Sequence, residues 1–207
     1  MGQTAADVAI IDYGMGNLRS VAKAFEKLGA VVAVTRSPEV IVTAKRVVLP
    51  GVGAFGDCMD NIRQYGLDTV IYQLIADDKP FLGICLGLQM LFEGSDEAPG
   101  VKGLGIFPGF VRKIEASGLK VPHMGWNSLQ FHQTSLLFNQ LSAAPFVYFV
   151  HSYHAVPADP SLLTASTTYG GIVTAAVGRG KVQAVQFHPE KSSASGMSIL
   201  NNFLAVE

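Results

Sequence analysis

The chain has 207 residues, of which 49% are apolar and 15% charged, with 15 basic and 16 acidic side chains. This length favours a single domain, 1–207, with a substantial core. The balanced charge lacks the positive cluster of a nucleic-acid-binding protein. No apolar run is long enough to span a bilayer.

The N-terminal segment lacks the basic region of a secretory signal. Without such a signal, Cys58 and Cys85 are expected to be free thiols in a reducing compartment. These features predict a cytoplasmic protein that binds neither nucleic acid nor membrane.

The first part of the chain alternates strands with helices. Short apolar runs predict strands at Val8–Asp12, Ala30–Thr35, Arg46–Leu49 and Phe81–Ile84. Helical spacing predicts helices at Leu18–Leu28, Asp57–Arg63 and Leu67–Ala76, with a short one after Pro38. Asn17 is suited to cap the first helix and Gly29 to end it. Such alternation is typical of a parallel sheet with helices on both faces.

After Gly94 the pattern changes to short strands joined by glycine, proline and polar turns. The apolar runs predict strands at Gly103–Ile114, Leu129–Phe131 and Phe146–Val150. The turn Gly178-Arg179-Gly180 predicts a hairpin of Gly170–Val177 with Lys181–Phe187. A helix at Ser195–Val206 closes the chain. The C-terminal half of this α/β domain is therefore expected to carry antiparallel strands.

The stretch Phe81–Phe92 joins a predicted strand to a helix-forming run, Leu88–Phe92, and Cys85 lies at the junction between Gly83 and Gly87. This Gly-x-Cys-x-Gly pattern is the cysteine counterpart of a nucleophile elbow. The glycines would permit a sharp turn with positive φ, and a cysteine at a helix N-terminus is activated as a nucleophile. The alternative is a buried structural cysteine between two packing glycines.

A cysteine nucleophile needs a base, and His188 is the best placed of the five histidines. It follows an apolar strand, at the end where α/β proteins carry their sites. Pro189 favours an extended backbone at His188. Glu190 would then lie on the same side of the chain and hold one imidazole nitrogen. Taken alone, His188 would be interpreted as a strand-end histidine bonded to the backbone. Together with Glu190 and Cys85 it predicts a catalytic triad.

Gly51–Gly56 matches the dinucleotide-binding pattern Gly-x-Gly-x-x-Gly, which would indicate an oxidoreductase. The segment follows the third predicted strand rather than the first, and Pro50 and Phe55 crowd its turn. No acidic residue ends a following strand at the required distance. We therefore reject a dinucleotide site and expect no cofactor and no metal.

Two motifs carry a resemblance to a known family, Gly83–Gln89 (GICLGLQ) and Gln186–Ser192 (QFHPEKS). They resemble the signatures of class I, triad-type glutamine amidotransferases. Pro122–Asn127 (PHMGWN) and Tyr148–Tyr153 (YFVHSY) narrow the resemblance to the glutaminase subunits of imidazole glycerol phosphate synthases. The resemblance implies a flavodoxin-like fold, in which helices cover both faces of an open, mixed, mostly parallel central sheet.

The resemblance also implies a chemistry. Cys85 would attack the side-chain amide of L-glutamine, and His188, held by Glu190, would give a proton to the leaving ammonia. The backbone N–H groups of Val52 and Leu86 would form the oxyanion hole. The residues implied to bind glutamine are Gly53, Gln89, Glu97, Ser152 and Tyr153. By residue type alone, Gln89 could equally face solvent, and Glu97, in a polar loop, is expected to do so.

A partner is implied as well, a (β/α)₈-barrel cyclase subunit that uses the ammonia to make imidazole glycerol phosphate and AICAR. Asn17, Trp126 and Lys191 are implied at the interface. Trp126 could instead belong to the core, and Lys191 could be merely solvated. Because glycines flank Val52, its peptide can flip at a small cost in free energy. The N–H for the oxyanion would then point away at rest, and the liganded cyclase would select the competent orientation.

Other functions stay open at this point. The chain could be the glutaminase subunit of an anthranilate or pyridoxal phosphate synthase, or a γ-glutamyl hydrolase with the same triad. A catalytically silent domain that only binds a partner is the non-enzymatic alternative.

Overall fold

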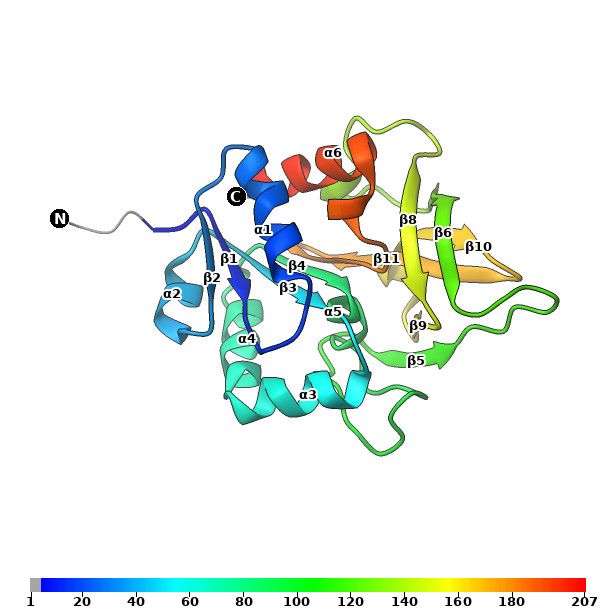
Figure 1. The fold of residues 1–207 in the computed structure, drawn as a ribbon, viewed down its shortest axis with the longest axis horizontal. Helices are drawn as coiled ribbons and strands as arrows, with labels where there is room; N and C mark the ends of the chain where they lie inside the picture. Colours follow the sequence, from blue (N-terminus) through cyan, green and yellow to red (C-terminus); the bar gives the residue numbers. More distant parts are fainter. Residues whose placement is uncertain (1–4) are drawn as a thin grey trace.

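The computed structural model describes residues 5–207, so the first four residues of the N-terminal segment considered above lie outside the described residues. Its centre is one sheet of eight strands: β1 (Val8–Ile11), β2 (Val32–Thr35), β3 (Arg46–Gly51), β4 (Phe81–Cys85), β7 (Gln130–Phe131), β10 (Leu163–Thr168), β11 (Ile172–Arg179) and β12 (Val182–Val185). The strand order is β2-β1-β3-β4-β12-β11-β10-β7 (Figure 1). The first five of these run parallel and the rest are antiparallel. The predicted mixed, mostly parallel sheet is confirmed.

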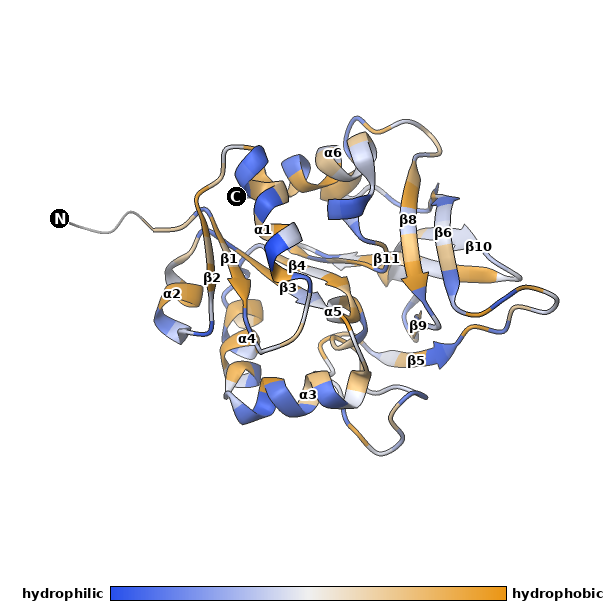
Figure 2. Ribbon diagram, viewed as in Figure 1, coloured by the Kyte–Doolittle hydropathy of each residue, from blue (hydrophilic) through white to orange (hydrophobic). Residues whose placement is uncertain are grey.

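Helices cover both faces of this sheet. α1 (Leu18–Lys27) and α6 (Ser193–Leu204) pack on one face, and α2 (Pro38–Thr43), α3 (Phe55–Gln64) and α4 (Leu67–Ala76) pack on the other. Residues of β1 alternate between the two cores, because successive side chains of a strand point to opposite faces. Figure 2 shows β1, β3 and β4 coloured as hydrophobic, as expected for strands buried on both faces.

Both ends of α1 lie within one residue of the predicted positions. Asn17 precedes the helix, but its side chain makes no capping hydrogen bond. At the other end Gly29 has a φ of +86°. The N–H groups of Gly29 and Ala30 donate to the backbone oxygens of Glu26 and Phe25 (2.9 and 3.2 Å). These are the two bonds of a Schellman motif, so the predicted glycine ending is confirmed.

Two small antiparallel sheets complete the C-terminal half, β5 (Gly109–Lys113) with β9 (Tyr153–Pro157) and β6 (His123–Ser128) with β8 (Phe146–His151). The predicted hairpin of β11 and β12 is confirmed. The strand predicted from Gly103 begins only at Gly109. The sequence pattern does not predict β6, β9 and β10, because polar residues and glycine interrupt their apolar alternation. Short 3-10 helices lie at η1 (Leu136–Phe138), η2 (Pro160–Leu162) and η3 (Pro189–Lys191).

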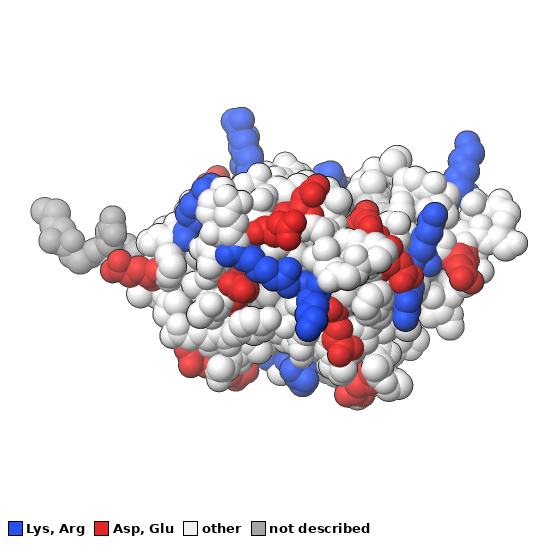
Figure 3. All heavy atoms as spheres, turned by 90° about the horizontal axis from the view of Figure 1, so that it is seen from below, with Lys and Arg blue, Asp and Glu red and all other residues white. Residues whose placement is uncertain are grey.

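The surface carries charges of both signs. Figure 3 shows acidic and basic side chains interspersed over one face of the molecule. Within residues 5–207, no helix combines the length and the apolar character needed to cross a membrane.

Candidate active site

Three neighbouring strands of the sheet end at one place. β3, β4 and β12 run parallel, and the register of β3 with β4 aligns Gly51 with Cys85. Val52 follows β3, Leu86 follows β4, and His188 comes shortly after β12. The carboxyl ends of parallel strands are where α/β proteins carry their sites. The sheet therefore brings these segments, which are distant in the sequence, to one edge.

Cys85 forms a strained turn between β4 and α5 (Leu86–Gln89). Its φ of +56° with ψ of −111° lies in a region that non-glycine residues avoid. Such a conformation costs about 1–3 kcal/mol. The prediction that the flanking glycines supply the positive φ is wrong, since the cysteine itself adopts it. Strain at the nucleophile is a property of the elbow turn.

The glycines of the elbow permit a close approach instead. A Cβ on Gly87 would lie 1.9 Å from the backbone oxygen of Leu49 in β3. A Cβ on Gly83 would lie 2.9 Å from the backbone oxygen of Gly87, and one on Gly51 would lie 2.7 Å from Leu86 Cβ. Helix α5 therefore lies directly against β3 and β4, and this contact fixes the position of the elbow.

Helix α5 is shorter than the sequence predicts. The helix-forming run extends to Phe92, but α5 ends at Gln89. The backbone oxygens of Met90 and Phe92 accept hydrogen bonds from the N–H groups of Leu104 and Gly105 (2.8 and 3.1 Å). The run is thus a buried turn held by a distant segment, which an apolar pattern does not distinguish from a buried helix.

His188 and Glu190 form a buried hydrogen-bonded pair, with His188 Nδ1 and Glu190 Oε1 2.9 Å apart. The alternative that the backbone satisfies this imidazole is therefore wrong. His188 has the expected extended backbone, but Glu190 lies in η3 rather than in extended chain. The 3-10 turn, and not the period of a strand, brings the carboxylate to the ring.

The second ring nitrogen, His188 Nε2, is buried and has no hydrogen-bond partner among the described residues. Burial of the imidazole lowers the pKa of His188, but the neighbouring Cys85 sulfur and Glu190 carboxylate outweigh burial and raise the pKa to about 9. His188 is therefore protonated at neutral pH. Its side chain can donate a proton to a group bound beside it.

A cavity of about 340 Å³ lies beside Cys85 and His188, a size that suits a small metabolite. Every residue predicted for catalysis, the oxyanion hole or glutamine binding lines this cavity, except Glu190, which lies behind His188: Val52, Gly53, Cys85, Leu86, Gln89, Glu97, Ser152, Tyr153 and His188. Pro122, Val150 and His151 also line it. Within residues 5–207, no group of three or more His, Cys, Asp or Glu side chains is arranged to hold a metal ion.

Gln89 is buried in the cavity wall, with 3% of its surface exposed, so the solvated alternative is wrong. Its Nε2 donates to the backbone oxygen of Tyr153 (3.0 Å) and to Gln186 Oε1 (3.1 Å). Both amide hydrogens are used, and Gln89 Oε1 is buried without a hydrogen-bond partner in the described part of the chain. Glu97 is half-buried, and its Oε2 accepts the N–H of Phe55 at the start of α3 (2.9 Å).

Two side chains hold the glycine-rich segment Gly51–Gly56 at the end of β3. The hydroxyl of Tyr13 donates to the backbone oxygen of Pro50 (2.9 Å), and Cys58 Sγ lies 3.6 Å from the backbone oxygen of Val52. Gly53 has a φ of +104°, a conformation that favours glycine. The segment that matches the dinucleotide pattern thus forms part of the cavity wall.

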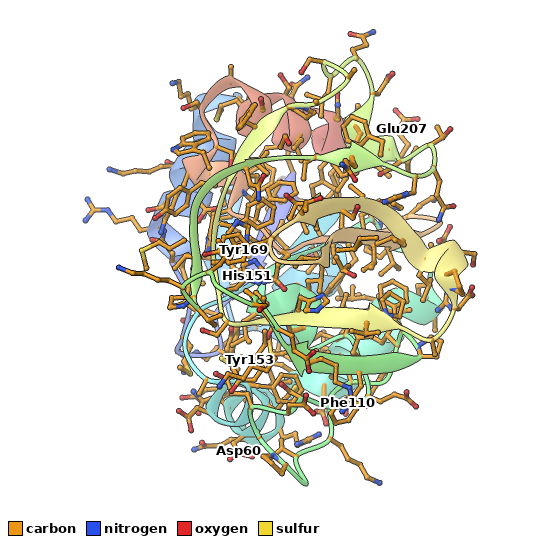
Figure 4. The ribbon with its side chains drawn as sticks, turned by 90° about the vertical axis from the view of Figure 1, so that its right-hand side faces the viewer. Asp60, Phe110, His151, Tyr153, Tyr169 and Glu207 are labelled. Carbon is orange, nitrogen blue, oxygen red and sulfur yellow. The ribbon has the colours of Figure 1, made fainter. Side chains whose placement is uncertain are left out.

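A buried histidine pair borders the cavity, and the sequence pattern does not point to it. His151 Nδ1 donates to the backbone oxygen of Tyr153 (2.8 Å), so its Nε2 accepts from His123 Nδ1 (3.1 Å). His123 Nε2 in turn accepts from Asn127 Nδ2 (3.3 Å). Burial lowers the pKa of His123 to about 4 and that of His151 to about 3. The ring of Tyr169 stacks on His123 with 4.1 Å between ring centroids, and Figure 4 labels Tyr169 and His151.

The three residues predicted at a partner interface lie outside the cavity lining. Trp126 on β6 is 50% exposed, so the alternative that it belongs to the core is wrong. Met124 on the same strand is 62% exposed. Lys191 is exposed at the end of η3, and Asn17 is half-buried before α1. Because η3 contacts both α1 and β8, and β8 pairs with β6, these residues belong to neighbouring elements.

The family model for class-I glutamine amidotransferases matches residues 9–206. The chain belongs to this family. This amidotransferase is similar to the imidazole glycerol phosphate synthase subunit HisH of Acaryochloris marina, with 50% identity over 200 residues that cover 95% of this chain and 93% of the relative. The HisH subunit of Geobacter metallireducens is 48% identical over 204 residues, which cover 96% of this chain and 97% of the relative.

Solved structures share the fold of this amidotransferase. A crystal structure described as a glutamine amidotransferase has a TM-score of 0.76 at 21% identity and covers 97% of this chain and 98% of its own. The PurLQS structure from Thermotoga maritima has a TM-score of 0.70 at 18% identity and covers 96% of this chain and 97% of its own. The predicted amidotransferase fold is confirmed.

Proposed function

We propose that this chain is the glutaminase subunit of an imidazole glycerol phosphate synthase, folded as one amidotransferase domain, 1–207. It hydrolyses L-glutamine to glutamate and ammonia. The observation that carries the proposal is the cavity where the elbow cysteine, Cys85, lies beside the buried His188–Glu190 pair. The HisH relatives described above support the assignment to this synthase.

The reaction proceeds in two halves. The Cys85 thiolate attacks the carboxamide carbon of glutamine, and the protonated His188 gives its Nε2 proton to the nitrogen that leaves as ammonia. A γ-glutamyl thioester remains on Cys85. His188, now neutral, takes a proton from water as the water attacks the thioester, and glutamate leaves. Glu190 holds Nδ1 throughout and stabilises the charged ring.

The oxyanion formed in each half needs N–H donors that are already in place. We assign this role to the backbone N–H groups of Val52 and Leu86, which line the cavity from either side of the elbow contact. Removing one such donor typically reduces the rate about 10²–10³-fold. Tyr13 and Cys58 hold the carbonyl groups around Val52, so they position this part of the site.

The substrate is held largely by hydrogen-bond acceptors. Gln89 offers an unused buried oxygen, and Glu97 keeps one carboxylate oxygen free for the amino group of glutamine. Gly53, Ser152 and Tyr153 complete the binding wall. An acceptor-rich wall suits the ammonium and amide hydrogens of the ligand.

The ammonia passes to a cyclase subunit, which we propose is a (β/α)₈ barrel. The exposed Trp126 and Met124 on β6 are apolar anchors of the kind found at interfaces. Lys191 and Asn17 lie on adjoining elements and extend the same surface. We place the complex in the cytoplasm, where the buried free thiols of Cys58 and Cys85 stay reduced.

The alternatives are separated by their partners and products. A glutaminase of anthranilate or pyridoxal phosphate synthesis would release ammonia to a different acceptor, and a γ-glutamyl hydrolase would need none. The test is co-expression with a cyclase subunit, followed by measurement of AICAR release from phosphoribulosyl-formimino-AICAR-phosphate and glutamine. Glutamine-dependent AICAR release in the complex with the cyclase supports the proposal. No AICAR release with the cyclase, together with glutamine-dependent anthranilate formation with an anthranilate synthase subunit, contradicts it.

The role of Cys85 is tested in the same complex by Cys85→Ala. We expect glutamine-dependent AICAR release to fall by at least about 10³-fold, because the nucleophile is lost. Release driven by an ammonium salt should stay at the wild-type level, since the cyclase is untouched. Loss of both activities in an intact complex would show that Cys85 does more than hydrolyse glutamine. Retention of both would rule it out as the nucleophile.

A further inference from the structure

Gln186 connects the nucleophile to the glutamine-binding wall. It directly follows β12 and is fully buried, and its backbone N–H donates to the backbone oxygen of Ala175 (2.8 Å). Its side-chain Oε1 accepts from Gln89 Nε2 (3.1 Å), and its Nε2 lies 3.7 Å from Cys85 Sγ. Gln186 does not line the cavity, so it acts on the site from behind.

The direction of this chain of hydrogen bonds is fixed by one carbonyl group. The backbone oxygen of Tyr153 only accepts, so the atom of Gln89 that faces it is the NH₂ group. That NH₂ group also faces Gln186, where the atom must therefore be the amide oxygen. The remaining end of Gln186, which faces the sulfur of Cys85, is an NH₂ group that only donates.

We propose that Gln186 is a further catalytic residue, which donates a hydrogen bond to the sulfur of Cys85 and holds the amide oxygen of Gln89 toward the bound glutamine. The proposal rests on the glutaminase function proposed above. A donor aimed at the sulfur favours its anionic form, both before attack and when the thioester is cleaved. Gln89 Oε1 is then held ready to accept an N–H of the substrate.

Substitutions at Gln186 separate this role from simple packing. Gln186→Met keeps a side chain of similar size without a donor, and Gln186→Glu replaces the donor by a carboxylate that repels a negative sulfur. We expect kcat/KM for glutamine to fall about 10- to 100-fold in Gln186→Met, the effect of losing one hydrogen bond to a charged group. The decrease should be larger in Gln186→Glu.

Gln183 lies in β12, the strand that Gln186 directly follows, and offers a matched control. It is also a buried glutamine, but its amide contacts Ser135 Oγ and the backbone oxygen of Gly180, away from the cavity. Gln183→Met should leave kcat/KM within about twofold of wild type in the folded protein, because no group of the site is touched.

The decisive readout needs no substrate. Iodoacetamide alkylates the anionic sulfur, with formation of a carbon–sulfur bond and loss of iodide, and the rate at Cys85 is followed by mass spectrometry as a function of pH. Half-maximal alkylation should move to higher pH by about one unit in Gln186→Met, further in Gln186→Glu, and not at all in Gln183→Met. The titratable groups around the sulfur, His188, Tyr13 and Cys58, are the same in all variants. An unchanged profile in folded Gln186 variants would overturn the proposal.

A second measurement uses the side-chain NH₂ resonances of the wild-type protein, so it remains possible if the Gln186 variants do not fold. The side-chain NH₂ resonances of Gln186 in the wild-type protein should shift when Cys85 is alkylated, because the sulfur ceases to be an anionic acceptor. Resonances that do not move would contradict the contact. If the wild-type complex hydrolyses no glutamine, the proposed function fails, yet the alkylation and resonance tests of the contact keep their meaning.

Discussion

The buried pair His123 and His151 should make the protein lose stability in mild acid. Both rings are neutral when folded, with pKa values of about 4 and about 3 against the ordinary histidine value of 6.5. Below the unfolded pKa the unfolded chain binds more protons than the folded one. The free energy of unfolding therefore falls as the pH decreases from 6.5 toward the folded values.

The size of this effect follows from the linkage relation. A histidine charged only in the unfolded state lowers the free energy of unfolding by at most about 1.4 kcal/mol per pH unit. His123 lies beside Asn127 nearer to the surface, so its share is the smaller one. Together the pair should remove about 2 kcal/mol between about pH 5.5 and pH 4.5. That is a large fraction of the stability of an ordinary domain.

Urea unfolding at several pH values measures how steeply the free energy of unfolding changes with pH. The fluorescence of Trp126, the single tryptophan, reports on unfolding from the same strand as His123. Carboxylates also titrate in this range, so the test compares slopes between variants. His123→Gln removes one titrating group and should reduce the slope by up to about 1 kcal/mol per pH unit. Phe203→Leu on α6 is a control that destabilises by packing alone and should keep the wild-type slope. A wild-type slope in His123→Gln would refute the reasoning.

Three further outcomes are expected. Gly87→Ala places a Cβ 1.9 Å from the backbone oxygen of Leu49. It should lower the free energy of unfolding, measured by chemical denaturation, by at least about 3 kcal/mol. In the control Gly171→Ala the added Cβ enters open space, so its free energy of unfolding should match that of wild type. The kcat/KM for glutamine should decline on the alkaline side near pH 9, where His188 loses its proton; a decline centred near neutral pH would contradict the assigned acid. Trp126→Ala should weaken binding of the cyclase at least tenfold in titration calorimetry, with an unchanged melting temperature, because half of this ring is exposed in the free subunit.

The sequence predicts the parallel half of the fold well, because its signals are local and strong. Val8–Ile11 and Arg46–Gly51 are apolar runs buried on both faces, and α4 has the predicted bounds. The C-terminal half is less predictable, since β6 and β10 contain glycine, threonine and serine. In addition, β6 pairs with β8 and β10 pairs with β7, across connections longer than a hairpin turn.

The site shows the same division. The pattern around Cys85 predicts an elbow because close packing demands glycine at fixed positions, yet it assigns the strained φ to the wrong residue. The His188–Glu190 contact is predicted, but through the wrong backbone geometry. Gln186 and His151 escape prediction, because their roles depend on three-dimensional neighbours such as the backbone oxygen of Tyr153.

The hairpin of β11 and β12 fixes the position of His188 relative to Cys85. β12 is hydrogen-bonded to β11 on one side and to β4 on the other, so neither neighbour lets it slide. A slip by one residue would carry His188 about 3.3 Å along the strand direction and turn alternate side chains to the opposite face. Insertions or deletions in the tight bend at Gly180 should thus abolish glutaminase activity, although no residue of the site has been replaced.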